Sequence, residues 1–514
     1  MHVLLSGATG YLGKHLLARC LRDGHFVTAL VRGGERARLL SALAPFALPA
    51  RLTDEARLAV AAADLARPVI DCAASILVRG RPDVLIHAAG LTRFEAHLAD
   101  DLARHNLGGT QHAFGLARAL DIPVFHHFST AYVAGTARRS FGAGDLDVGQ
   151  GFHNPYEATK FAAERWLREV APDSGTALVV HRPSIVVGGH PIGATHAVST
   201  LYTFLQAVRF LRECCRRDAE RGRHAFAKLG VRRSGEEFYV PVRVAADPAA
   251  TVNLVAIEDV VDAICAACAH APDAQAVHTQ ALTGHDYPIA ALARAITTTM
   301  RVSGVQLVPA AAFAAAPRNT LEAHFHRITQ VYAPYLFGSP RFAPRPSARH
   351  IDVTRLTRDY LAQIHSPSPA PSRVRCEPGL GGLALATLGI RAPRDYFMAL
   401  CEGAIGRHFL AHHDYVEAIV GFHLHGESPG EFTLRIDGGR AALAADAATR
   451  VDCRYELDSA LFMRIVHGEA DLRASFLAGQ VRIAGDLELA LKFGALLGRY
   501  YGRFDEHLLT ELSA

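Results

Sequence analysis

The sequence predicts an α/β protein in which a doubly wound parallel sheet is followed by a separate α+β domain. From Met1 to about Ser184, short apolar runs alternate with amphipathic segments, a pattern typical of parallel strands covered by helices on both faces. The tract 338–372 contains SPRFAPRPSAR and SPSPAPS and predicts a linker. Beyond it, strands and helices no longer alternate strictly, as expected of an α+β unit.

The first unit is expected to contain a Rossmann-type sheet and a smaller substrate lobe. Its best strand candidates are His2–Leu5, Phe26–Val31, Val84–Ala88, Val124–Phe128 and Ala177–His181. Helical patterns between them include Leu12–Leu21 and Asp101–Leu120. From about Val187 to Phe342 the pattern is less regular, with a basic helical stretch at Tyr202–Arg223, and this part predicts the substrate lobe.

The second unit combines helices with a sheet. We expect a helix at Asp395–His412 and strands at Val416–Leu424, Glu431–Ile436, Ala441–Asp446, Val451–Leu457 and Gln480–Ala484. IDGGRA is a hairpin signal, Asp458-Ser459 can cap a helix ending at Gly468, and a final helix follows Gly485-Asp486. The expected domains are 1–345, a linker at 346–393 with a short helix at Val353–Ile364, and 394–514.

Composition narrows the class of protein. With 50% apolar residues, 20% charged residues and a net charge of +4, the chain is typical of globular proteins and offers no case for nucleic acid. Nine cysteines, mostly far apart in the sequence, favour reduced thiols over a disulfide framework and with them a cytoplasmic location. MHVLLSG enters a strand directly, so we expect no signal peptide, and no run approaches the ~18–20 apolar residues of a transmembrane segment. The sequence leaves open both peripheral contact with a membrane and the formation of a homodimer.

The first motif, GATGYLG, lies between a strand and a helix. Its glycines at 7, 10 and 13 allow a tight turn, close approach to a pyrophosphate and packing of the helix on the sheet, and the helix N-terminus faces the phosphates. The candidate cofactor residues of this loop are Gly7, Thr9, Gly10, Tyr11, Leu12 and Gly13.

The end of the second strand favours NADP(H). The sequence VTALVRGGER places Arg32 where an NAD enzyme carries a carboxylate for the ribose 2′-hydroxyl, with Arg36 and Arg38 close behind. A guanidinium can instead bind a 2′-phosphate. A solvated basic helix start is the alternative. Asp64 and Leu65 suit the adenine edge, and the run Ala88, Ala89 and Gly90 allows close backbone passage along the cofactor.

The second motif, HNPYEATK, carries candidate catalytic chemistry. Asn154 and Pro155 predict a helix start, so Tyr156 and Lys160 share one helix face. An ammonium one turn away stabilises the phenolate and makes tyrosine an acid–base. Upstream, Thr130 with Ser129 beside it ends a strand and can hold the substrate oxygen.

Together these motifs resemble the extended short-chain dehydrogenases/reductases over about residues 1–345. GATGYLG, HAAG, Asn106 with Gly109-Thr110, STAYV, NPYEATK and HRPSIVVG carry the resemblance, and within that group they look most like fatty acyl-CoA and thioester reductases of the male-sterility type. The resemblance implies Thr130, Tyr156 and Lys160 as catalytic residues. It adds Asn106, Lys160, Pro183 and Ser184 to the cofactor site. The chain departs from the group in lacking the all-helical tail of animal and plant fatty acyl reductases.

The second unit resembles a sterol carrier protein type 2 (SCP2) domain. The segments FTLRIDGGRAAL and YELDSALFMRIVHGEADLRASFLAGQVRIAGDLELALKF carry this likeness over about 394–509. The family implies an apolar tunnel for acyl chains or sterols. A tunnel filled by side chains, in a domain that only supports a dimer, is the alternative.

The leading hypothesis is an NADPH-dependent reductase of a long-chain acyl thioester carried on coenzyme A or a carrier protein. A sterol 3β-hydroxyl dehydrogenase/decarboxylase using the same residues is the first alternative, and a non-enzymatic NADP- and lipid-binding protein is the second. No metal site is expected, because the histidines at 412, 413, 423 and 425 lack a ligand motif. The basic run at 214–217 is interpreted as a solvated helix face rather than as a coenzyme A site.

Overall fold

The computed structural model divides the chain into two units, Met1–Ser368 and Pro369–Ala514, which are described separately. The described residues are 1–137, 139–188, 200–220, 225–269, 277–338, 340–343, 345–365, 390–402, 418–437, 440–444, 451–466, 470, 472–477, 479–485 and 490. Among them, no helix combines the length and the apolar composition needed to cross a bilayer.

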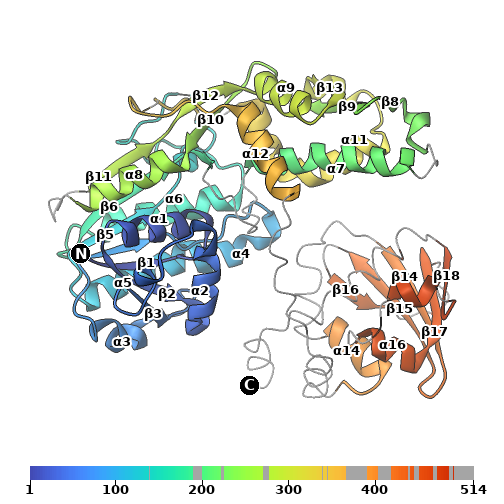
Figure 1. Cartoon of the computed structure of the whole chain (residues 1–514), viewed down its shortest axis with the longest axis horizontal. Helices are drawn as coiled ribbons and strands as arrows, with labels where there is room; N and C mark the ends of the chain where they lie inside the picture. Colours follow the sequence, from blue (N-terminus) through green and yellow to red (C-terminus); the bar gives the residue numbers. More distant parts are fainter. Residues whose placement is uncertain are drawn as a thin grey trace. The chain divides into compact units, whose positions relative to one another are not determined.

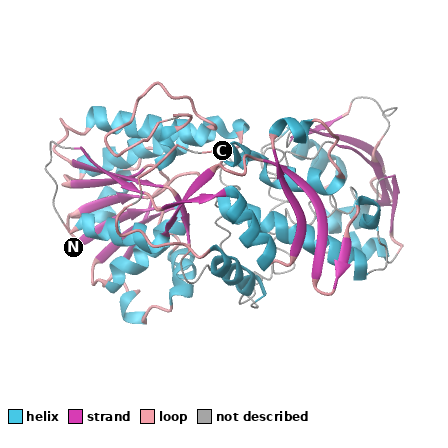
Figure 2. Ribbon diagram, turned by 90° about the horizontal axis from the view of Figure 1, so that it is seen from above, coloured by secondary structure: helices cyan, strands magenta, loops and turns pink. Residues whose placement is uncertain are grey.

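The first unit is built on a parallel sheet of seven strands (Figures 1 and 2). The strand order is β11-β6-β5-β4-β1-β2-β3, so it reverses between β1 and β4, where doubly wound folds bind ligands. The strands are β1 His2–Ser6, β2 Phe26–Val31, β3 Leu58–Ala62, β4 Val84–His87, β5 Val124–Phe128, β6 Ala177–Pro183 and β11 Val277–Leu282. The predicted fold class is confirmed.

Helices cover both faces of this sheet, as Figure 2 shows. Side chains alternate along each strand, so Val3 and Leu5 pack in one core with α1 and α8, whereas Leu4 packs in another with α5 and α6. The helices are α1 Tyr11–Arg22, α2 Arg36–Leu43, α3 Ala73–Leu77, α4 Ala99–Leu102, α5 Gly109–Ala119, α6 Pro155–Val170 and α8 Ile257–Cys268. Short 3-10 segments are η1 Arg32–Gly34, η2 Ala44–Phe46, η3 Ala50–Leu52, η4 Ile70–Cys72, η5 Ala96–Leu98, η7 Ala131–Ala134, η8 Ala225–Leu229 and η9 Gln330–Phe337.

The helix predicted at Asp101–Leu120 is interrupted. Between α4 and α5 the chain forms a π-helical segment, η6 Ala103–Gly108. Such segments occur frequently at functional sites. This one carries Asn106, whose contacts are given below.

The substrate lobe contains two three-stranded sheets, in the orders β12-β10-β7 and β13-β9-β8. Its strands are β7 Ile185–Val187, β8 Arg232–Ser234, β9 Glu237–Ala245, β10 Thr251–Ala256, β12 His285–Pro288 and β13 Val302–Val308. Its helices are α7 Thr200–Glu220, α9 Ile289–Thr299, α10 Ala310–Ala314, α11 Thr320–Thr329 and α12 Val353–His365. Val353, Leu356 and Tyr360 of α12 are buried in the core of the lobe, so this helix belongs to the first unit.

The second unit is a five-stranded sheet with helices. The strand order is β16-β15-β14-β17-β18, with β14 and β17 parallel and the other pairs antiparallel. The elements are α14 Pro393–Glu402, β14 Ala418–His425, β15 Gly430–Asp437, β16 Arg440–Leu443, β17 Cys453–Asp458, α16 Ser459–Val466, α17 Leu472–Leu477 and β18 Val481–Gly485. Asp458 Oδ1 accepts from Ala460 N at 2.8 Å and caps α16. The rest of the predicted helix at 395–412 and the predicted final helix lie almost wholly outside the described residues.

Aromatic rings fill the described interior of the second unit. Phe397 of α14 stacks on Phe432 and Phe462, with centroids 4.3 and 5.3 Å away, and Phe422 stacks on Tyr455 at 4.9 Å. A lipid entering between the sheet and α14 or α16 therefore has to displace aromatic side chains.

Candidate active site

The glycine loop after β1 has the geometry that its motif predicts. Gly7 has a φ of +73°, and a Cβ there would lie 2.6 Å from the carbonyl carbon of Ala88. A Cβ on Gly13 would lie 2.0 Å from the Gly7 oxygen, so only glycine lets α1 pack this closely on the loop. Gly10 N donates to Gly7 O at 2.9 Å and closes the turn.

The first turn of α1 is open toward an anion. Gly10 provides no side-chain cap, and the first turn contains no acidic residue. The first amide groups of a helix have no partner within the helix, and together with the helix dipole they favour a phosphate. Ser184, after β6, adds a buried hydroxyl oxygen for which no partner is found among the described residues. These features fit a dinucleotide lying across the ends of β1, β4 and β6.

The two arginines after β2 differ in what they contact. Arg32 is exposed at the strand end, where a 2′-phosphate would lie. The Arg36 guanidinium instead donates to the backbone oxygens of Leu58 and Thr53, at 2.6 and 2.5 Å. Arg36 therefore fastens β3 to the preceding loop, and Arg32 is the better candidate for binding a cofactor phosphate.

Other predicted cofactor residues are held by protein contacts. Asp64 Oδ1 accepts from Ala66 N at 3.2 Å, and Leu65 O accepts from His112 Nδ1 at 2.9 Å. Tyr11 donates its hydroxyl proton to Gly188 O at 2.6 Å, while Gly188 N donates to the hydroxyl of Tyr202 on α7 at 3.1 Å. Tyr11 thus fastens the glycine loop to the substrate lobe, and Leu12 packs against the core beneath α1.

Asn106 joins the end of β4 to α6. Its Oδ1 accepts from Leu91 N at 2.7 Å, and its Nδ2 donates to Leu91 O at 3.0 Å and to the Thr159 hydroxyl at 3.2 Å. A Cβ on Gly90 would lie 3.1 Å from Asn106 Oδ1. The side-chain amide of Asn106 therefore positions the loop that contains Ala88, Ala89 and Gly90.

The structure brings Thr130, Tyr156 and Lys160 to one place. Asn154 Oδ1 accepts from Glu157 N at 3.0 Å and begins α6, which carries Tyr156 and Lys160 on one face. Thr130 follows β5 and is hydrogen-bonded to the Tyr156 phenol. It also approaches the Pro183 oxygen at 3.4 Å.

Burial determines the protonation states of Tyr156 and Lys160. Burial raises the pKa of Tyr156 to about 12, partly offset by the Thr130 hydrogen bond, so the phenol carries its proton at neutral pH. Lys160 is only 5% exposed, and burial lowers its pKa to about 8 against the attraction of Glu164. The site therefore holds a neutral acid beside an ammonium that titrates in a mildly alkaline range.

Sequence reasoning did not identify a buried ion pair beneath this site. Arg182 on β6 donates from Nε to Glu164 Oε2 at 3.0 Å and from Nη2 to Oε1 at 2.6 Å. Ser129 donates to Glu164 Oε2 at 2.6 Å, and Arg168 donates to Oε1 at 2.9 Å. Arg182 lies within the segment HRPSIVVG, whereas Glu164 lies four residues beyond the motif HNPYEATK. Their ion pair supports the interior behind Thr130 and Lys160.

Neutral histidines lie below Lys160. His87 is hydrogen-bonded to Ser6 at 2.9 Å and to Thr110 at 3.2 Å, and it stacks on His127 at 5.9 Å. Burial, with the nearby Lys160 charge, lowers the pKa of His87 to about 3 and moves the pKa of His127 in the same direction. Neither histidine therefore titrates in the working range of an enzyme.

Aromatic rings separate Tyr156 from the substrate lobe. Phe94 stacks on Tyr156 with centroids 5.3 Å apart and approaches Tyr335 at 5.8 Å. The Tyr335 hydroxyl donates to Glu157 Oε1 at 2.5 Å and accepts from Asn154 Nδ2 at 2.8 Å. Tyr335 is thereby bonded to the first turn of the helix that carries Tyr156.

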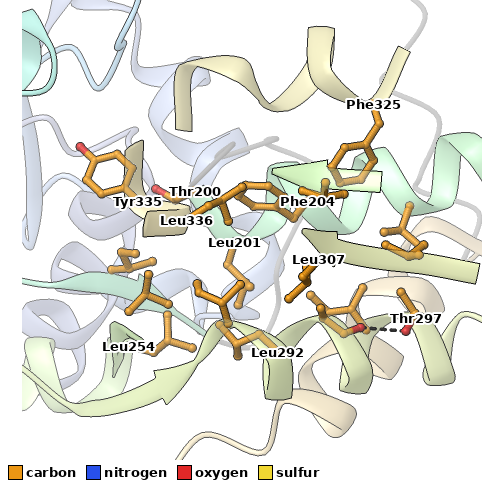
Figure 3. A pocket seen from close by; sticks show the side chains of 18 residues that line it. Thr200, Leu201, Phe204, Leu254, Leu292, Thr297, Leu307, Phe325, Tyr335 and Leu336 are labelled. Carbon is orange, nitrogen blue, oxygen red and sulfur yellow. Dashed lines mark hydrogen bonds between the residues drawn. The ribbon is translucent and has the colours of Figure 1, made fainter. Parts of the chain in front are cut away.

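Beyond Tyr335 lies an apolar cavity of about 80 Å³ (Figure 3). Side chains from β7, β10, α7, α9, β13 and α11 form its wall. The wall includes Leu201, Phe204, Leu254 and Leu292, with Tyr335 at one end and Thr297 toward the other (Figure 3). This apolar cavity suits a hydrocarbon chain.

The described residues contain no group of three side chains placed to hold a metal ion. His423 and His425 on β14 instead approach Glu431 and Asp458, at 3.5 and 3.8 Å. Two of the four histidines considered, 412 and 413, lie outside the described residues.

Known proteins match both units. Residues 5–221 match the family described as male sterility protein, a family of NAD-binding domains, and residues 411–498 match the SCP-2 sterol transfer family. The polyketide synthase-nonribosomal peptide synthetase ACE1 of Pyricularia oryzae is 32% identical over 198 residues, which are 36% of this chain and 5% of that protein. The 4-hydroxy-2-methyl-3-oxo-4-farnesyl-3,4-dihydroquinoline-1-oxide ketoreductase of Stigmatella aurantiaca is 32% identical over 194 residues, 37% of this chain and 51% of that protein. The chain thus covers only a small part to about half of these relatives.

Among solved structures, the terminal R domain of the myxalamid PKS-NRPS biosynthetic pathway shares the fold, with a TM-score of 0.53 and 18% identity over 71% of this chain and 90% of that domain. Fold, glycine loop and family match together indicate that the first unit is a nicotinamide-binding domain of the extended short-chain dehydrogenase/reductase type. Its nucleotide-binding part is thus similar to the male-sterility family, and its second unit is similar to SCP2 domains.

Proposed function

We propose that this protein uses NADPH to reduce a long-chain acyl thioester to the aldehyde, or onward to the alcohol. The apolar cavity, which is linked to Tyr156 by the ring contacts of Tyr335 and Phe94, is the observation that carries the proposal. The relatives support it, because they include a ketoreductase and a terminal reductase-type domain. The proposed carrier of the thioester is coenzyme A or a carrier protein, and the SCP2 domain is proposed to hold or deliver the lipid.

The residues supply positioning and a proton. When bound, NADPH supplies a hydride to the thioester carbon. The hydroxyls of Thr130 and Tyr156 donate hydrogen bonds to the carbonyl oxygen, and Tyr156 transfers its proton to that oxygen as the C=O π bond breaks. The resulting hemithioacetal breaks its C–S bond, the thiol leaves with a proton, and the aldehyde remains. The Lys160 ammonium stabilises the phenolate left on Tyr156.

Two substrates test the proposal on the whole chain. A long-chain acyl-coenzyme A with NADPH is expected to give aldehyde or alcohol, detected by gas chromatography with matching loss of NADPH. A 3β-hydroxysterol with NADP⁺ is expected to show no turnover. Sterol oxidation without thioester reduction would assign the site to sterols, and no turnover of either substrate would favour a binding protein.

The exposed Arg32 is proposed to select NADPH. We expect NADPH to bind at least tenfold more tightly than NADH, about 1.4 kcal/mol, and Arg32→Ala to remove this preference. Fluorescence titration with both cofactors measures it. Arg36→Ala is the control, because its guanidinium contacts Leu58 and Thr53 and should affect stability rather than selectivity. Equal affinities in the unaltered protein would remove the assignment.

The lowered pKa of Lys160 predicts an alkaline limit. The ammonium is present below pH about 8 and is lost as pH rises through that value, so kcat/KM for reduction is expected to fall there. Lys160→Arg, charged throughout this range, should be slower but free of the fall. A pH profile of both proteins measures this, and a flat profile to pH about 10 in the unaltered enzyme would contradict it.

The SCP2 domain is proposed to raise substrate concentration rather than to take part in the chemistry. A chain ending at Ser372 should bind NADPH and reduce a short, water-soluble thioester with an unchanged kcat, but should show a raised KM for long chains. Steady-state kinetics of the truncated and full chains compare them. An insoluble truncated chain, or a lower kcat on the short substrate, would instead give the second unit a structural role.

A further inference from the structure

Three cysteines gather where α1 packs on α8, on one face of the parallel sheet (Figure 1). Cys20 lies on α1 and is only 3% exposed, whereas Cys265 and Cys268 lie about one helical turn apart on α8 and are partly exposed. All three are free thiols, and none of them belongs to the candidate active site. Because thiolates react with oxidants and then with other thiols, such a cluster is a candidate modification site.

The three cysteines differ in what they contact. Cys265 is hydrogen-bonded to Cys20, so these two sulfur atoms meet across the interface between the helices. The Cys268 sulfur instead lies 3.8 Å from Nε2 of His126 on β5, a ring whose pKa burial lowers to about 3. That neutral ring offers no positive charge to a thiolate, and burial raises the pKa of Cys268 to about 12. Cys20 and Cys265 are therefore the pair placed to form a disulfide.

The surroundings of Cys265 favour its thiolate. The hydrogen bond with Cys20 lowers the pKa of the Cys265 thiol, and the Arg19 guanidinium lowers it further, against burial and two nearby carboxylates. Arg19 donates to Asp262 Oδ1 at 2.6 Å and to Asp23 Oδ2 at 2.7 Å, so its charge is fixed where α1 meets α8. The same thiol–thiol hydrogen bond, together with burial, raises the pKa of Cys20, which stays protonated. One member of the pair is thus suited to react first, and the other to react with the product.

We propose that Cys265 is an oxidant-sensitive thiol and that Cys20 is its resolving partner, so that hydrogen peroxide converts the pair into a disulfide joining α1 to α8. The Cys265 thiolate attacks one oxygen of the peroxide, the O–O bond breaks, and hydroxide leaves, which gives a sulfenic acid. The Cys20 sulfur then attacks the Cys265 sulfur, the S–O bond breaks, and the oxygen leaves as water with the Cys20 proton. The hydroxide takes up the proton that Cys265 released on ionisation. The two thiols are oxidised by two electrons, and the peroxide is reduced to two molecules of water.

The disulfide is expected to stabilise the first unit. Cys20 and Cys265 are separated by most of the sequence of that unit, so a cross-link between them strongly restricts the unfolded chain. We expect the oxidised protein to unfold at a temperature roughly 5 °C above that of the reduced protein, and dithiothreitol to reverse the shift. Thermal unfolding followed by the fluorescence of Trp166 on α6 measures it.

Peptide mapping of the full-length protein tests the proposal directly. The reduced protein is treated with hydrogen peroxide, the remaining thiols are alkylated, and a digest is analysed by mass spectrometry without reduction. We expect a cross-linked peptide pair that contains Cys20 and Cys265. In the reduced protein, alkylation should be about tenfold faster at Cys265 than at Cys268.

Three single variants separate the roles of the cysteines. Cys20→Ala should stop at the sulfenic acid of Cys265, which dimedone labels, and Cys265→Ala should form neither the sulfenic acid nor the disulfide. Cys268→Ala is the matched control on the same helix and should still form the disulfide. A disulfide between Cys265 and Cys268, no cross-link in the unaltered protein, or an unchanged unfolding temperature after cross-linking would overturn the proposal.

Discussion

Replacing Tyr156 with phenylalanine is expected to lower kcat roughly 10²–10⁴-fold, the usual contribution of a positioned acid. The change removes one hydroxyl, which is hydrogen-bonded to Thr130 and donates the proton in the proposed reaction. The ring stays in place against Phe94, so affinity for NADPH should remain nearly unchanged. Single-turnover kinetics and a cofactor titration separate the two effects.

Tyr239→Phe is a matched control for this variant. Tyr239 lies on β9 in the substrate lobe, where Arg232 packs over its ring, so loss of its hydroxyl should leave kcat within a factor of two or so. Substantial turnover in Tyr156→Phe would mean that the proton comes from another group.

Breaking the ion pair beneath the site is expected to have the largest effect on stability. Glu164→Ala leaves the Arg182 guanidinium, with a side chain only 2% exposed, without its carboxylate partner. Removing one member of a buried pair typically costs about 3–5 kcal/mol. Denaturant unfolding followed by tryptophan fluorescence measures the first unit specifically, because the single tryptophan of the chain, Trp166, lies on α6.

The control for Glu164→Ala lies on the same helix. Glu169 has a side chain that is 66% exposed and lies 4.0 Å from Arg165, so Glu169→Ala should change the unfolding free energy by about 0.5 kcal/mol or less. A similar small change for Glu164→Ala would show that Arg182 finds solvent or another partner when its carboxylate is removed.

The sequence predicts those parts of the fold and of the site that depend on residues close together in the sequence. The turn that requires Gly7 and the capped helix that carries Tyr156 follow from a few adjacent side chains. The structure brings Thr130, Tyr156 and Lys160 together, and their catalytic roles stay a prediction. Five of the seven strands of the parallel sheet were likewise predicted from short apolar runs, and β3 and β11 were not.

What the sequence missed depends on partners far apart in the chain. Asp101–Leu120 has a continuous helical pattern, but Asn106 bonds to Leu91 and Thr159 within a π-helical segment. Arg36 resembled a phosphate ligand until the structure placed its guanidinium on the carbonyl groups of Thr53 and Leu58. The hollow lined by Arg209, Arg212 and Arg301 combines α7 with a turn after α9, and no local pattern links them.

The Tyr335 hydroxyl has a consequence for how substrates of different length react. One side of this residue lines the apolar cavity, and its hydroxyl is bonded to Glu157 and Asn154 at the start of the helix that carries the acid. An acyl chain that contacts the Tyr335 ring therefore also exerts a force on the first turn of that helix. Binding energy gained far from the reacting carbon becomes available to align the phenol. The length of the acyl chain should then change the rate constant of hydride transfer as well as the affinity for the substrate.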